Sequence, residues 1–193
     1  MKMMKTLLAA AVVAASVPAM AYEAGDMMLK AGVINVNPKS DNIDLGGSYA
    51  QIDDNTQLGL TFTYMVTPQI GVEVLAATPF EHDVKAGGNK IASTKHLPPT
   101  VSAQYYFMDG TSNVQPYVGL GLNYTTFFDE SGAADSLADS WGWALSAGVN
   151  YDLNEQWLLN AAVWKMSIES ELNGALDVEI DPVVVMIGGG YKF

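Results

Sequence analysis

The chain has 193 residues, of which 49% are hydrophobic and 16% charged, and its net charge is −12. A nucleic-acid binder needs a basic face that displaces counterions from phosphates, so this charge balance excludes that role. The sequence contains no cysteine, which excludes a disulfide framework, a thiolate nucleophile and a cysteine-bound zinc site.

The first predicted element is a secretory signal peptide over residues 1–21. Basic Met1–Lys5 precedes the apolar run Leu7–Val17 and then Ala19-Met20-Ala21, which is the order of a cleavable leader. A membrane anchor is the alternative, but the run is shorter than the roughly 20 residues of a spanning helix. We therefore expect cleavage before Tyr22 and a single exported domain over residues 22–193.

Period-two alternation of apolar and small or polar residues then dominates the mature chain. Leu58, Leu60, Phe62 and Tyr64, for example, alternate with Gln57, Gly59, Thr61 and Thr63. Successive side chains of a strand point to opposite faces, so each such segment has one apolar face. In a soluble sandwich this face packs on a second sheet, whereas in an outer-membrane barrel it contacts lipid.

Two features favour the barrel over a soluble periplasmic or secreted protein. The apolar faces end in aromatic residues, as expected at a membrane interface. Long connections also alternate with short ones. We predict an all-β, eight-stranded antiparallel transmembrane β-barrel with strands near 26–36, 57–65, 70–79, 97–107, 114–124, 141–151, 157–168 and 181–193.

The connections give the predicted orientation in the membrane. Those at 66–69, 108–113 and 152–156 are short and are expected to be periplasmic turns. Those at 37–56, 80–96, 125–140 and 169–180 are long, and we expect solvated, mobile extracellular loops. The last strand ends in Phe193, a terminal aromatic residue that fits the signal read by the outer-membrane assembly machinery.

Several stretches in this order resemble the outer membrane protein W (OmpW) family over nearly the whole chain. They are Glu23–Gly25, Asn55–Tyr64, Ile70–Glu73, Ala76–Phe80, His96–Thr100, Pro116–Gly119, Asn123–Phe128, Asp139–Gly142 and the closing strand from Asp181-Pro182 to Gly190–Phe193. Val183 departs from the usual Trp, and Lys30 and Lys192 from a frequent Arg. The resemblance implies an eight-stranded barrel associated with passage of small hydrophobic molecules across the outer membrane of Gram-negative bacteria.

The inward register predicts an internal charge network. Asp26, Lys30, Glu73 and Lys192 fall on the inward face toward the periplasmic half of the barrel. Unpaired charges in a narrow lumen are costly, so we expect them to be paired. A structural plug is the expected role, rather than a proton relay.

Farther toward the outer face the inward residues become apolar on four strands. We predict that Ile34, Leu75, Trp164, Met166 and Met186 line a hydrophobic constriction. Eight strands leave an interior that side chains fill or that holds one small ligand, so a wide aqueous pore is excluded. The residues leave packing and a hydrophobic conduit equally open, and the family resemblance favours the conduit.

We expect neither an enzyme nor a metal or cofactor site. His82 and His96 lie at the ends of the second long connection, and no nucleophile–base motif accompanies them. Glu81 and Asp83 lack the ligand spacing of a metal site with these histidines.

The predicted function is therefore an outer-membrane channel for small hydrophobic molecules. The expected partners are small hydrophobic solutes, outer-membrane lipid and lipopolysaccharide, and the assembly machinery through Phe193. The alternative is a structural or surface-recognition barrel whose loops contact phage, bacteriocin or host without transport.

Overall fold

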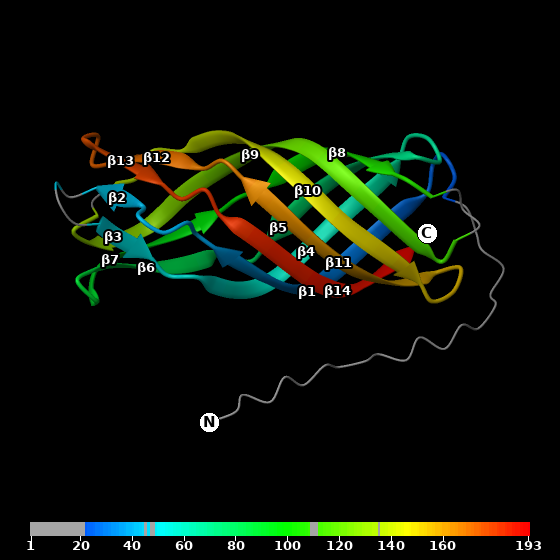
Figure 1. Cartoon of the computed structure of the whole chain (residues 1–193), viewed down its shortest axis with the longest axis horizontal. Helices are drawn as coiled ribbons and strands as arrows, with labels where there is room; N and C mark the ends of the chain where they lie inside the picture. The colour runs from blue at the N-terminus through cyan, green and yellow to red at the C-terminus, as the bar shows by residue number, and fades with distance from the viewer. Residues whose placement is uncertain (1–21, 45, 47–48, 109–111, 135) are drawn as a thin grey trace, which may run out of the picture.

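A computed structural model describes residues 22–44, 46, 49–108, 112–134 and 136–193, so the predicted signal peptide at 1–21 lies outside the described residues. The described part is built from fourteen β-strands (Figure 1). Within it, no helix is long and apolar enough to cross a membrane.

Eight of the strands close into an antiparallel barrel, which confirms the predicted fold. Neighbours pair in the order β10-β11-β14-β1-β4-β5-β8-β9, and pairing of β9 with β10 closes the ring. The barrel strands are β1 (Met27–Asn37), β4 (Asn55–Met65), β5 (Ile70–Ala77), β8 (Thr100–Tyr106), β9 (Val114–Gly132), β10 (Ser140–Asp152), β11 (Trp157–Met166) and β14 (Val183–Lys192).

Prolines set the starts of two strands that the alternation alone placed two or three residues too early. The fourth barrel strand begins at Thr100 instead of residue 97, and the last at Val183 instead of residue 181. Pro98, Pro99 and Pro182 precede these starts, and a proline has no backbone N–H to donate to a neighbouring strand.

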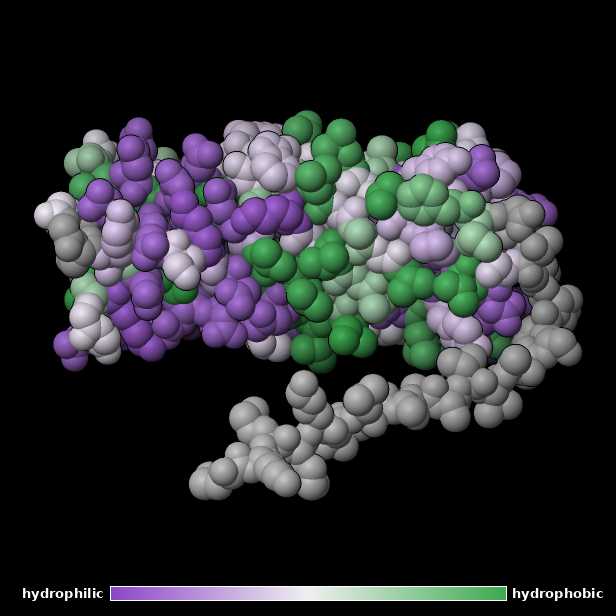
Figure 2. All heavy atoms as spheres, viewed as in Figure 1, coloured by the Kyte–Doolittle hydropathy of each residue, from purple (hydrophilic) through white to green (hydrophobic). Residues whose placement is uncertain are grey.

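The outward face of the barrel is apolar and exposed, as the alternation predicts. Leu58, Leu120 and Ile187 are 54%, 63% and 67% exposed. Aromatic residues stand near the ends of this face, where Trp141 is 73% exposed and Phe193 70%. Figure 2 shows apolar residues over the barrel and polar residues gathered at one end.

The two ends of the barrel differ. The short β4–β5, β8–β9 and β10–β11 connections lie at one end, called here the turn end, near the start of β1 and the end of β14 (Figure 1). The N–H of Phe193 donates to the carbonyl of Met27 at 2.9 Å there. The opposite end, called the loop end, carries all the longer connections.

The long connections are not the solvated, mobile loops that we expected. They contain six further strands, and β9 continues eight residues beyond its predicted end to Gly132. We call these six strands and residues 125–132 of β9 the extension, which stands on the loop end of the barrel (Figure 1). The six strands are β2 (Ile43–Asp44), β3 (Tyr49–Ile52), β6 (Phe80–Ala86), β7 (Asn89–Leu97), β12 (Glu169–Leu172) and β13 (Leu176–Glu179).

In the extension the two strand faces are reversed relative to the barrel, so the alternation expected of a lipid-facing strand does not apply there. In β6 the inward side chains are Phe80, His82 and Val84, all buried, while Glu81 and Asp83 point outward. The barrel strands show the opposite pattern, with apolar residues outward and many polar residues inward. Beyond the lipid the outward face meets water, so charged side chains belong there and apolar ones pack inside.

Candidate functional site

The interior of the barrel at the turn end is filled by a polar cluster built around one ion pair. Nζ of Lys30 on β1 lies 2.7 Å from Oε2 of Glu73 on β5, and the two side chains are 0% and 1% exposed. Thr63 Oγ1 on the intervening β4 donates to the same carboxylate oxygen at 3.2 Å. Two of the four inward charges that we expected to be paired, Lys30 and Glu73, therefore pair with each other.

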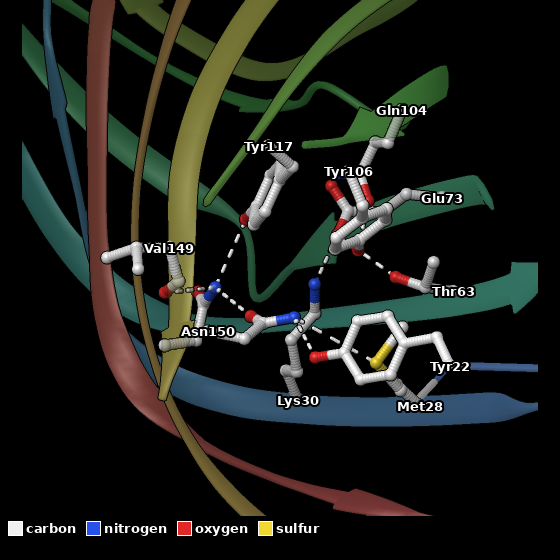
Figure 3. Close-up of polar contacts among 11 residues, drawn as sticks. Tyr22, Met28, Lys30, Thr63, Glu73, Gln104, Tyr106, Tyr117, Val149 and Asn150 are labelled. Carbon is white, nitrogen blue, oxygen red and sulfur yellow. Dashed lines mark hydrogen bonds and ion pairs between the residues drawn. The ribbon is translucent and has the colours of Figure 1, made fainter. Parts of the chain in front are cut away.

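Tyrosine and asparagine side chains complete the cluster (Figure 3). Asn160 donates to the hydroxyl of Tyr117 at 3.1 Å and to the side-chain oxygen Oδ1 of Asn150 at 2.8 Å. Asn150 donates in turn to the hydroxyl of Tyr22 at 3.0 Å. We call this cluster the polar plug; its members are Tyr22, Lys30, Thr63, Glu73, Gln104, Tyr106, Tyr117, Asn150 and Asn160, each at most 3% exposed.

Glycines on the inward face make room for the plug. A Cβ at Gly148 would lie 2.5 Å from the ring of Tyr117, and one at Gly190 would lie 2.7 Å from Cγ of Lys30. A side chain at either position would displace a plug residue, because packed interiors leave no space of that size.

The predicted four-member charge network is wrong in its membership. Lys192 pairs with Asp152, at 3.3 Å, and not with Asp26. Asp26 lies one residue before β1, in a turn where its carboxylate accepts the N–H of Glu23 at 2.9 Å. The inward register ends where the strand ends, so strand parity did not apply to Asp26.

Above the plug, toward the loop end, the lumen becomes apolar. Ile34, Leu75, Trp164, Met166 and Met186 all point inward and are at most 3% exposed, and we call these five residues the apolar belt. Gly59 on β4 lies against it, since a Cβ there would be 2.9 Å from Cβ of Ile34 and 3.1 Å from Sδ of Met186. Their predicted role as a constriction remains a prediction.

The extension encloses a cavity of about 170 Å³, the loop-end cavity, which the sequence did not reveal. Its wall is mainly apolar and comes from β2, β3, β6, β7, β9, β12, β13 and their connections. The apolar side chains include Ile43, Val84, Phe127, Leu172, Val178 and Ile180. An engineered apolar cavity of about 150 Å³ in another protein binds benzene, so this volume suits a small ring compound.

His82 and His96 lie side by side in the wall of this cavity. Their ring centroids are 4.8 Å apart, and each side chain is 1% exposed. His96 also packs edge-on against Phe80 at 5.5 Å and Phe127 at 5.8 Å. Burial lowers the pKa of both imidazoles, to about 3 for His96, so both rings are neutral near pH 7.

The inward position of His82 could have been found from the sequence. Phe80, His82 and Val84 alternate with Glu81 and Asp83, which is a strand pattern with an apolar inner face. The barrel strands carry their apolar residues outward toward lipid, so the same parity rule assigns Phe80, His82 and Val84 to the wrong face. Tyr106 and Tyr117 did fall on the inward register, but nothing in the register marked them as plug residues.

Neither a catalytic arrangement nor a metal cluster is evident among the described residues. Ser93 Oγ lies 2.8 Å from Ser131 Oγ and is not bonded to a histidine. No group of three or more His, Asp or Glu side chains in the described part is placed to hold a metal ion.

Known proteins share this architecture and much of this sequence. The model of the OmpW family matches residues 23–193. Outer membrane protein W of Vibrio cholerae serotype O1 is 47% identical over 217 aligned residues, which cover 99% of this chain and 100% of that protein. The crystal structure of outer membrane protein OprG from Pseudomonas aeruginosa is 46% identical with a TM-score of 0.79, over 89% of this chain and 97% of that one.

A more distant relative is named for an apolar compound. The dibenzothiophene metabolism operon protein PahQ of Pseudomonas aeruginosa is 27% identical over 162 residues, which cover 77% of this chain and 76% of that protein.

Proposed function

The chain belongs to the OmpW family of Gram-negative outer-membrane β-barrels, and on that premise we propose that it is a channel for small hydrophobic molecules. In this proposal the loop end faces the outside of the cell and the turn end faces the periplasm, because outer-membrane barrels have long extracellular loops and short periplasmic turns. The observation that carries the proposal is the loop-end cavity, an apolar space of about 170 Å³ inside the extension that is large enough for a small solute.

The order of the interior surfaces supports the same role. From the loop end toward the turn end, the loop-end cavity is followed by the apolar belt and then by the polar plug. A solute that leaves the cavity toward the turn end therefore meets apolar side chains first. The plug places a buried ion pair and a hydrogen-bonded network across the lumen, which opposes passage of water and ions. The name of the relative PahQ, which refers to an apolar heterocycle, fits a hydrophobic cargo.

The alternative is a structural or surface-recognition barrel, whose interior serves only packing. A packed interior leaves few voids larger than a water molecule, whereas the loop-end cavity is far larger. We also propose that the chain acts without catalysis, since Ser93 bonds to Ser131 and the histidines pack on aromatic rings.

Uptake of an apolar fluorescent reporter into liposomes that contain the folded barrel tests the channel. Ala50 lines the loop-end cavity and is 0% exposed, whereas its neighbour Gln51 points outward on the same strand. Ala50→Phe should slow uptake because it fills the cavity, and Gln51→Phe should not. Equal uptake by the parent, both variants and protein-free liposomes would reject the channel and favour the structural alternative.

Two further partners are proposed from the outside of the barrel. We propose that the charged outward face of the extension contacts lipopolysaccharide at the outer surface of the membrane. Phe193 is 70% exposed beside Tyr191, whose ring centroid is 5.0 Å away, and we propose that the assembly machinery recognises this terminal aromatic residue.

A further inference from the structure

Four polar side chains line the otherwise apolar loop-end cavity: Thr94, Asn173 and the two histidines. Thr94 donates to the carbonyl of Lys95 at 3.3 Å. Asn173 donates to the carbonyl of Ala133 at 3.2 Å and accepts an N–H bond at 3.1 Å. These two side chains are occupied by contacts within the protein.

The histidines differ from them in one respect. Nε2 of His82 and Nε2 of His96 are buried, and neither atom has a hydrogen-bond partner among the described residues. Buried polar groups in proteins are nearly always hydrogen-bonded, because leaving one unsatisfied costs its lost hydration without compensation. Two such atoms, on adjacent rings that both line a cavity, indicate a group that enters the cavity to meet them.

The hydrogen-bonding role of His82 follows from its other nitrogen. Nδ1 of His82 lies 2.5 Å from the backbone carbonyl of Asp53, and a carbonyl oxygen can only accept. Nδ1 therefore carries the proton, and in the neutral ring Nε2 presents a lone pair. The entering group must donate a hydrogen bond to Nε2 of His82.

His96 narrows the choice of that group. Its ring is also neutral, so its Nε2 either donates or accepts, depending on the tautomer. A hydroxyl meets both requirements, because it donates one hydrogen bond and can accept another. The 4.8 Å between the ring centroids is compatible with one oxygen that bonds to both rings at about 2.8 Å each.

We propose that the loop-end cavity binds small apolar compounds that carry one hydroxyl group, with that hydroxyl held between Nε2 of His82 and Nε2 of His96. The hydrocarbon body then packs on Val84, Phe127 and Val178, which line the same space. The proposal rests on the proposed channel function and defines the chemical class of its cargo.

The surroundings argue against two other occupants. An ammonium group or a divalent ion would lose its hydration in an apolar space, which is costly without charged partners. The cavity wall carries no carboxylate among its lining residues, so such a charge would be unpaired. An uncharged hydroxyl carries no such penalty.

Two isosteric probes test the proposal: 4-methylphenol, and p-xylene, in which a methyl group replaces the hydroxyl. Binding to the full-length mature barrel in phospholipid nanodiscs is measured by calorimetry for each probe. His82→Leu should weaken 4-methylphenol about tenfold, because its hydroxyl is left unsatisfied, and should leave p-xylene unchanged within about twofold. Gln51→Leu is the control, since Gln51 points outward on β3 and does not line the cavity, and it should change neither affinity.

A measurement on the unaltered protein covers the case in which His82→Leu fails to fold. With ¹⁵N-labelled histidine, 4-methylphenol should shift the resonance of His82 Nε2 and p-xylene should not. Equal binding of 4-methylphenol by the parent and His82→Leu, or identical ¹⁵N spectra with both probes, would overturn the proposal.

Reporter uptake by Ala50→Phe tests the channel function separately from the binding of the two probes. If neither probe binds but Ala50→Phe still slows reporter uptake, the hydroxyl proposal fails and the channel stands. If neither probe binds and Ala50→Phe has no effect, both fail together.

Discussion

Breaking the Lys30–Glu73 ion pair from one side should destabilise the barrel more than removing both charges. The two side chains are 0% and 1% exposed and 2.7 Å apart, so neither charge can turn to water when its partner is lost. Oε1 of Glu73 already has no hydrogen-bond partner among the described residues, which leaves its carboxylate dependent on Lys30 and Thr63. A lone Glu73 carboxylate would therefore be poorly compensated.

The magnitude follows from that burial. Removing one partner of a buried pair typically costs about 3–5 kcal/mol, whereas replacing both partners is often close to neutral. We expect Lys30→Met and Glu73→Gln each to lower the free energy of unfolding by about 3 kcal/mol or more. The double variant should lose less than either single one, which gives a large coupling energy in a double-mutant cycle.

Reversible urea unfolding in phospholipid vesicles, followed by tryptophan fluorescence, measures these free energies. The exposed pair Lys95–Asp129 serves as the matched control, because its N–O distance of 3.1 Å is similar but its side chains are 37% and 65% exposed. That pair should show no measurable coupling, since water screens it. Strictly additive effects of Lys30→Met and Glu73→Gln would refute the reasoning.

Three other predictions concern the apolar belt, the topology and the histidines. Leu75→Ser and Trp164→Ser should each weaken binding of a small amphiphile by about 1–3 kcal/mol, the scale for one buried apolar side chain, while Val74→Ser on the lipid-facing side should not. Unchanged binding and conductance in the first two variants would mean that the apolar belt serves only to pack the interior. Protease added to intact cells should cut within residues 133–139, between the end of β9 and the start of β10, and cuts confined to the short connections would mean that the barrel has the opposite orientation in the membrane. Mass spectrometry should find Tyr22 as the first residue of the mature protein. The pKa of His96 should be about 3 by NMR titration, and a titration midpoint near 6.5 would contradict the burial argument. Because this pKa lies below the value of about 6.5 in the unfolded chain, the extension should lose stability as the pH falls from 6.5 toward 3, by about 2 kcal/mol at pH 5.

The barrel could be predicted from sequence because lipid imposes one simple rule on every spanning strand. Leu58 to Tyr64 follow that rule residue by residue, and the same parity placed Lys30 and Glu73 together inside. The rule stops where the environment changes. Asp26 lies before the first strand, so its parity had no meaning, and Asp152 was assigned to a turn although it ends β10 and pairs with Lys192.

The loop-end cavity was beyond the sequence for a different reason. Its wall combines residues from four connections far apart in the chain, such as Ile43, His82, Phe127 and Val178. Alternation predicts which face a side chain occupies within one strand, but it does not predict which strands meet. The pairing of β7 with the far part of β9, which brings His96 against Phe127, is visible only in three dimensions.

The reversed faces of the extension decide where foreign peptides can be inserted for surface display. One extra residue inside β6 would reverse the two faces of that strand beyond the insertion, because strand parity changes by one, and cavity-lining side chains there would turn outward. The tight turn between β6 and β7, at Gly87 and Gly88 with φ of 56° and 82°, is exposed and lies outside this alternation. An epitope tag placed between Gly87 and Gly88 should therefore reach antibodies on intact cells and leave the barrel assembled, whereas the same tag after Asp83 should abolish ligand binding.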